Sequence, residues 1–189
     1  MSIRYNSPVI LTYALICAAV MLLSNLTKGY FTQAFFTALP SMSFLNPLTY
    51  FRLFSHAIGH ADWTHLISNF SYILLIGPLL EEKYGSMAIL VKMLITAFVT
   101  GLLNTIFFST GLLGASGIVF MLILLASFAN IRDGEIPLTF VIVAALYLGQ
   151  ELVNSFKPDN VSQFAHILGG LAGAVFGFGG KFIAQTVGK

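Results

Sequence analysis

Residues Pro8–Leu26 read PVILTYALICAAVMLLSNL and contain no Asp, Glu, Lys or Arg. A helix of this length nearly spans a bilayer, which takes about 20 apolar residues at a rise of about 1.5 Å each. The run is also longer than the ~7–15-residue hydrophobic core of a signal peptide. We therefore expect it to be retained as a membrane-spanning helix.

The composition of the whole chain agrees with this interpretation. Of its 189 residues, 57% are hydrophobic and only 8% are charged, whereas soluble domains average about 25% charged residues. The sequence therefore predicts an all-α membrane protein, a six-transmembrane-helix bundle that forms a single membrane domain over residues 1–189 with no separate soluble domain. A long outer loop, residues 27–64, joins the first two spans, and the five further candidate spans are residues 65–80, 87–108, 116–130, 137–156 and 163–183.

The basic residues near the span ends predict the orientation, because cytoplasmic loops carry an excess of Lys and Arg. Three basic residues fall on one side of the membrane: Lys28, Arg52 and Lys157. Five fall on the other: Arg4, Lys83, Arg132, Lys181 and Lys189. Both termini are therefore expected in the cytoplasm, and the long loop is expected to face outward.

Charge and cysteine usage exclude several classes of function. The net charge of +2 is too small to suggest nucleic-acid binding, and Cys17 is the only cysteine, which excludes an intrachain disulfide and a CxxC metal or redox site. Three histidines, His56, His60 and His65, invite a zinc interpretation. Only Asp62 is near enough to complete a ligand shell, so we expect no metal and interpret His56 and His60 as structural hydrogen-bonding residues.

Uncommon polar residues collect at the outer ends of three spans that run in the same direction. His65 and Asn69 share one face at the start of the second span, Ser116 begins the fourth, and His166 lies at the start of the sixth. The apolar run of the fourth span, residues 118–129, covers only roughly 18 Å. Ser116 should therefore lie below the outer surface of the membrane, close to the other three side chains.

These residue types suit nucleophilic catalysis. A serine hydroxyl becomes a good nucleophile when an adjacent base takes its proton, and His166 is the only histidine in the second half of the chain. Backbone N–H groups at the start of the helix, with His65 and Asn69, could hold an oxyanion. No acidic residue is placed to orient His166, which favours a dyad; Asp62 and Asp159 are the alternatives for a third member.

At these residues the chain resembles the rhomboid intramembrane serine proteases, particularly the bacterial GlpG type. Residues 114–117, GASG, resemble the Gly-x-Ser-Gly nucleophile motif of that family. Residues 165–173, AHILGGLAG, resemble its final-span Ala-His-x-x-Gly-x-x-x-Gly motif. HADWTHLISN at 60–69 has its His-x₄-His-x₃-Asn spacing, and FRLFSH at 51–56 lies where the family carries a Trp-Arg pair.

The resemblance implies cleavage of single-pass transmembrane proteins in a bacterial inner membrane, at an active site that opens to the periplasmic side, without metal or cofactor. It implies that Ser116 is the nucleophile, that His166 is the general base, and that the Ser116 backbone N–H, His65 and Asn69 hold the oxyanion. Gly114 would support that site, and so would His60, Phe120 and Gly169. Two residues depart from the family pattern: Phe51 replaces the tryptophan, and Phe120 stands where relatives often have a tyrosine.

Two other functions compete with this hypothesis. Polar residues at mid-depth and broken helices also suit a transporter or channel, although the sequence has no inverted repeat. A non-catalytic relative that binds other spans is the third hypothesis.

Structural roles are expected for the glycine stripe Gly169, Gly173 and Gly177, which permits close contact with the fourth span. Arg52 is expected to tie down the outer loop, and residues 81–83 are expected to form a turn at the membrane interface.

Overall fold

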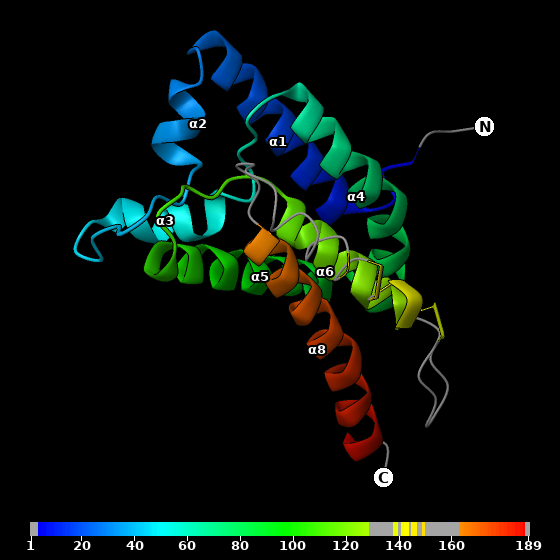
Figure 1. Cartoon of the computed structure of the whole chain (residues 1–189). Coiled ribbons are helices and arrows are strands. Elements are labelled where there is room, and N and C mark those ends of the chain that lie inside the picture. Colours follow the sequence, from blue (N-terminus) through cyan, green and yellow to red (C-terminus); the bar gives the residue numbers. More distant parts are fainter. Residues whose placement is uncertain are drawn as a thin grey trace.

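We describe the protein from a computed structural model that covers residues 4–128, several positions between 138 and 149, and residues 163–187. All the elements in these ranges are helices, apart from one isolated β-bridge between Ala38 and Leu112. The helices, shown in Figure 1, are α1 (Pro8–Leu26), α2 (Tyr30–Phe35), α3 (Pro47–Ser55), α4 (Trp63–Tyr84), α5 (Ser86–Phe107), α6 (Ser116–Ser127) and α8 (Gln163–Val187).

The helices follow the predicted spans closely. The bounds of α1 are those predicted, and α4, α5, α6 and α8 each overlap their predicted span. Three helices, α1, α4 and α5, are long and apolar enough to cross a membrane, while α6 and residues 164–179 form shorter apolar helices. Most of the expected fifth span, residues 137–156, lies outside the described residues, so the count of six spans stays a prediction.

The outer loop is not irregular along its whole length, because α2 and α3 form within it. Asn46 caps α3 by accepting a hydrogen bond from the Leu48 N–H, and Pro47 follows at the first helical position, where a missing N–H costs nothing. Arg52 of α3 donates from Nε to the Ala34 carbonyl over 3.0 Å. The expectation that Arg52 ties down the loop is confirmed.

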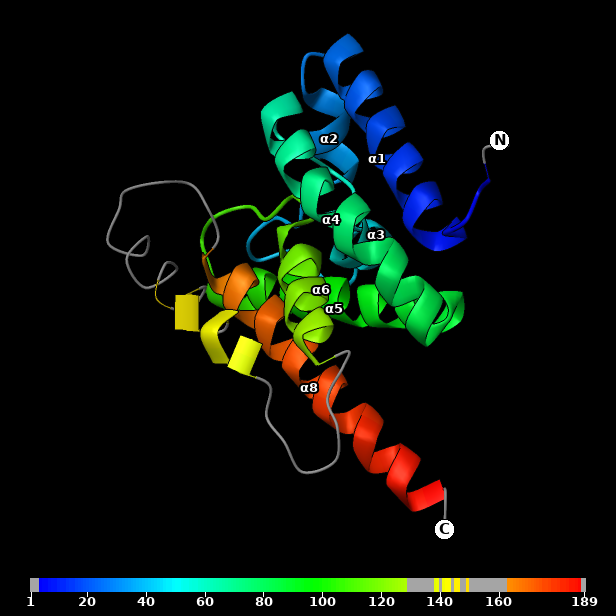
Figure 2. The same cartoon turned by 90° about the vertical axis from the view of Figure 1, so that its right-hand side faces the viewer.

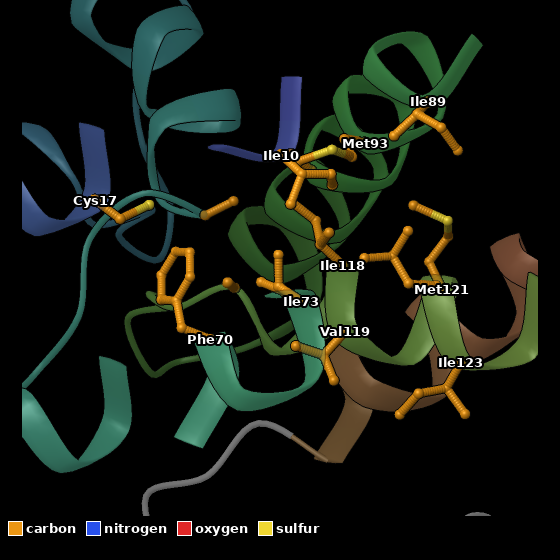
Figure 3. Close-up of a cluster of buried hydrophobic side chains, with 14 of the residues drawn as sticks. Ile10, Cys17, Phe70, Ile73, Ile89, Met93, Ile118, Val119, Met121 and Ile123 are labelled. Atoms are coloured by element: carbon orange, nitrogen blue, oxygen red, sulfur yellow. The ribbon is translucent and has the colours of Figure 1, made fainter. Parts of the chain in front are cut away.

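Helix α6 is the centre of the bundle. Its residues from Gly117 to Leu125 are all buried, so it presents no lipid-facing or solvent-facing stripe along that length. Figure 3 shows side chains from α1, α4 and α5 that surround it, among them Ile10, Ile73 and Met93. A helix that is enclosed by protein on every side need not span the bilayer by itself, which explains how a helix of 12 residues can be accommodated.

Helix α8 packs directly on α6, and the two lie side by side in both views (Figures 1 and 2). The contact runs along the glycine stripe. A Cβ placed on Gly173 would lie 2.3 Å from the Met121 carbonyl oxygen, and one on Gly177 would lie 2.5 Å from the Phe128 ring. The predicted role of these glycines in close helix contact is confirmed.

The expectation of an interfacial turn at residues 81–83 is wrong for Glu81. Glu81 is only 4% exposed and belongs to α4. Its two carboxylate oxygens accept hydrogen bonds from the Val9 and Ile10 N–H groups, each over 3.0 Å, and from the Ser86 hydroxyl over 2.6 Å. The first N–H groups of a helix have no partner within it, so Glu81 serves as a cap for α1 from a distant part of the sequence.

Candidate functional site

The N-terminal ends of α6 and α8 meet backbone to backbone. A Cβ placed on Gly169 of α8 would lie 2.0 Å from the Gly117 carbonyl oxygen, and one on Gly117 would lie 3.3 Å from the Ala165 carbonyl oxygen. Gly117 follows Ser116 directly, and Ala165 directly precedes His166. The structure therefore brings the chain segments that carry Ser116 and His166 into contact.

The imidazole of His166 stacks on the Phe120 ring. The ring centroids are 4.4 Å apart and the planes differ by only 9°. Phe120 lies one turn beyond Ser116 on α6, so the side chains at these two positions lie one above the other on the helix. The stack fixes the plane of the His166 ring at the end of α6 where Ser116 begins the helix.

The loop before α6 adds a second contact, with α4. Gly114 has a φ of +115°, in the left-handed region that favours glycine. A Cβ there would lie 2.6 Å from Cε1 and 2.7 Å from Nε2 of His65, and 3.8 Å from Nδ2 of Asn69. Both the conformation and the space therefore require a glycine at this position. The Gly114 backbone therefore lies against the His65 imidazole and near the Asn69 amide, the two side chains that the sequence predicts on one face of α4.

Asn69 offers an unused donor at this point. The residue is 6% exposed, and its Nδ2 has no hydrogen-bond partner among the residues the structure describes. A buried donor left unpaired costs about 1–3 kcal/mol. A group arriving beside Gly114 with a negative or partly negative oxygen would satisfy this donor.

His65 lies between two other histidines. Its ring meets the edge of His60 at a centroid distance of 5.1 Å and an interplanar angle of 70°. It is also near enough to His166 for an electrostatic interaction between the two imidazoles. The structure thus places His60 in ring contact with His65, and His65 within electrostatic range of His166.

The two loop histidines are neutral hydrogen-bonding groups. His56 donates from Nε2 to the Ala97 carbonyl over 2.9 Å, and His60 donates from Nδ1 to the Ile58 carbonyl over 3.0 Å. Burial lowers the pKa of each to about 4, against the weaker opposite effect of these hydrogen bonds. The expectation that both are structural hydrogen-bonding residues is confirmed.

Two acidic residues, Asp62 and Asp159, are the alternatives for a third catalytic residue beside Ser116 and His166. The Asp62 carboxylate accepts a hydrogen bond from the His65 N–H over 2.8 Å and caps α4. It therefore acts as a helix cap at the start of α4. Asp159 lies outside the described residues. Across the described parts of the chain, no three His, Cys, Asp or Glu side chains gather in a way that could hold a metal ion.

Comparison with known proteins shows the family of this chain. The family model described as "Rhomboid domain" matches residues 47–181, which include every residue of the site described above. The chain belongs to the rhomboid family.

Three curated relatives of this rhomboid chain match about two thirds of it. The Rhomboid protease GlpG of Haemophilus influenzae is 23% identical over 133 residues, which is 67% of this chain and 68% of that protein. RHOMBOID-like protein 1 of Arabidopsis thaliana is 31% identical over 137 residues, 67% of this chain. Rhomboid-like protein 11, chloroplastic, of the same plant is 29% identical over 131 residues, 68% of this chain. The match spans 33% and 42% of the two plant proteins. Membership of the family supports a hydrolase of the serine protease class.

Sequence reasoning missed one set of polar residues on α5, two of which lie next to the start of α6 or the loop before it. Thr96, Thr100 and Asn104 are buried on α5. The Thr100 methyl group would lie 3.4 Å from a Cβ on Gly117, and Asn104 donates from Nδ2 to the Thr110 carbonyl over 2.9 Å, holding the loop before α6. Their spacing of four residues, which places them on one helix face, is the signal that could have identified them.

Proposed function

We propose that this rhomboid chain is an intramembrane protease that cleaves transmembrane proteins with a Ser116–His166 dyad. The observation that carries the proposal is the meeting of the N-terminal ends of α6 and α8, with the His166 ring stacked on Phe120 one turn from Ser116. A serine–base pair from two helices needs this kind of close, fixed approach.

In the proposed reaction, His166 takes the proton of the Ser116 hydroxyl as Oγ attacks the peptide carbonyl. The carbonyl oxygen becomes an oxyanion as the C–O bond to Ser116 forms. His166 then gives the proton to the leaving amine, and the C–N bond breaks to leave an acyl-enzyme. A water molecule then gives a proton to His166 and attacks the acyl carbonyl; the C–O bond to Ser116 breaks, and His166 returns the proton to Oγ.

The oxyanion would be held by the Ser116 backbone N–H together with His65 and Asn69. The Ser116 N–H is among the first of α6, where the helix supplies no partner. The support for the side-chain donors is the position of Gly114, whose backbone lies against the His65 imidazole and near the buried Asn69 amide. Gly114 leaves room for these donors at a place that a side chain would fill.

Three more residues would support the site without touching the reacting atoms. Phe120 would keep the His166 ring in plane, as its stacking suggests. Gly169 would let α8 approach α6 closely enough for proton transfer, and His60 would brace His65 by edge contact. No metal or cofactor takes part in this scheme.

The proposed setting is a bacterial inner membrane, which the chain would cross six times as a single domain. Both termini would lie in the cytoplasm and the site would open to the periplasmic side, in agreement with the excess of basic residues on the predicted cytoplasmic side. Substrates would be single-pass transmembrane proteins, reached from the surrounding lipid and cleaved at small residues in helix-destabilising sequence.

Labelling with a serine-directed fluorophosphonate tests nucleophile and base together. The purified full chain should be labelled at Ser116 and should cleave a transmembrane test substrate, while Ser116→Ala and His166→Ala should lose both reactions. Ser127→Ala is the matched control, because Ser127 lies at the other end of the same helix and donates to the Ile123 carbonyl. Cleavage that persists in Ser116→Ala would refute the proposed function.

A further inference from the structure

A cavity of about 350 Å³, open to the outside, lies beside His60. It is lined by the end of α1, by α2 and its following residues, and by the loops before α4 and α6. Half of its ten lining residues have polar side chains: Ser24, Thr32, Gln33, Thr37 and His60. A buried water needs about 10–15 Å³ and two to four polar partners, so the cavity is large and polar enough for several.

Two of these residues each leave a buried polar atom without a hydrogen bond. Thr32 is 5% exposed and His60 is 1% exposed. Within the part of the chain that the structure describes, neither Oγ1 of Thr32 nor Nε2 of His60 has a partner. Buried polar groups that lack a protein partner are the usual sites of internal water.

The chemistry of the two atoms is complementary. Nδ1 of His60 donates to the Ile58 carbonyl, so a neutral ring carries its lone pair on Nε2, which must accept. Burial, the largest influence, lowers the pKa of His60 to about 4 and keeps the ring neutral at pH 7. The Thr32 hydroxyl can donate and accept. One water can therefore accept from Thr32 and donate to His60.

The backbone holds these residues close together. A Cβ on Gly59, the neighbour of His60, would lie 2.3 Å from the Phe36 carbonyl oxygen and 3.1 Å from Cγ2 of Thr32. The His60 loop is thus pressed against α2, and Thr32 is the side chain of α2 that it meets. Backbone contact therefore sets the distance between the His60 loop and α2, and the cavity lies beside this contact.

We propose that this cavity binds water that links the Thr32 hydroxyl to Nε2 of His60, and that this link makes His60 a positioning residue for His65. The His60 and His65 rings are in edge contact. A His60 ring that is held at both nitrogens cannot rotate, and it fixes the His65 imidazole that faces Gly114. The positioning part rests on the proposed function, because it assumes that His65 holds the oxyanion.

The water site can be tested without any protease activity. Nitrogen-15 NMR of the full chain with labelled histidine should show His60 as the Nδ1–H tautomer at pH 7. Thr32→Val should shift the His60 Nε2 resonance, while Thr32→Ser, which keeps the hydroxyl, should not. Thr105→Val is the matched control, because Thr105 is a buried threonine that bonds the Gly101 carbonyl and does not line the cavity.

Kinetics and crystallography complete the test. Thr32→Val should lower kcat about five-fold, the effect of one hydrogen bond, with KM unchanged, and Thr32→Ser should restore it. A crystal structure of the wild type should show a water within hydrogen-bonding distance of both atoms. A dry cavity, or an Nε2 resonance unaffected by Thr32→Val, would overturn the inference. Cleavage that survives Ser116→Ala would instead overturn the proposed function and leave the water site standing.

Discussion

Replacing Gly169 by alanine tests whether the approach of α8 to α6 sets the catalytic geometry. The new Cβ would lie 2.0 Å from the Gly117 carbonyl oxygen, whereas real Cβ contacts are essentially never shorter than 3.0 Å. The other atom belongs to buried backbone and cannot rotate away, so the helices must separate by about 1 Å. A misplacement of about 1 Å can cost about 10²-fold in rate. We therefore expect kcat of Gly169→Ala to fall about 100-fold.

The assay compares Gly169→Ala with Gly170→Ala, which is the matched control on the same helix. A Cβ on Gly170 would meet only Leu124 Cγ at 3.8 Å, an ordinary contact. Alanine in a helix interior is favoured over glycine by roughly 0.5–1 kcal/mol, so Gly170→Ala should keep its activity and gain slightly in stability. Fluorophosphonate labelling rates and substrate cleavage should fall together in Gly169→Ala. Equal activity in the two variants would show that helix separation at Gly169 does not govern the dyad.

Three further predictions concern other parts of the structure. Asn69→Ala should lower kcat about 10²-fold with little change in KM, because the lost donor acts on the transition state; steady-state cleavage kinetics measure this, and an unchanged kcat would exclude Asn69 from the oxyanion site. Glu81→Gln should lower the free energy of unfolding by about 1–3 kcal/mol, since it weakens charged hydrogen bonds to the start of α1. Glu82 is exposed, so Glu82→Gln should change the free energy of unfolding by less than about 0.5 kcal/mol. Denaturation of the two variants in detergent makes the comparison. Stability should also fall as the pH drops from about 6.5 toward 4, because burial lowers the pKa of His56 and His60 to about 4 and the unfolded chain then binds more protons. Each histidine should contribute about 2 kcal/mol of this loss at pH 5. Thermal unfolding across this pH range checks it: the stability of His56→Gln should fall less steeply with falling pH than that of the wild type.

The helical frame could be predicted because its signals are local. An uncharged run of the right length fixed both ends of α1, and a four-residue glycine repeat identified the face of α8 that packs on α6. Spacing alone placed His65 and Asn69 on one face of α4. These features depend on helix geometry and hydrophobic length, which act within a few turns of the chain.

Other features depend on contacts between distant residues, which composition does not encode. Glu81 appeared to belong to a charged interfacial turn, yet it caps a helix some 70 residues earlier in the chain. The cavity beside Thr32 arises because Gly59 allows the loop before α4 to touch α2. Glu81 carries no signal of its own role, since two glutamates followed by a lysine are also what an exposed turn requires.

The site is assembled from backbone contacts rather than from side-chain bonds alone. Gly117 meets Gly169, Gly114 meets His65, and Gly59 meets the end of α2. Backbone contacts have little freedom to relax, because a peptide plane cannot change rotamer as a side chain does. Since α6 is buried on all sides, it provides the fixed reference against which α4 and α8 are placed. Among the contacts of the described residues, the α6–α8 contact is the one whose displacement would move the segment that carries His166 away from the segment that carries Ser116.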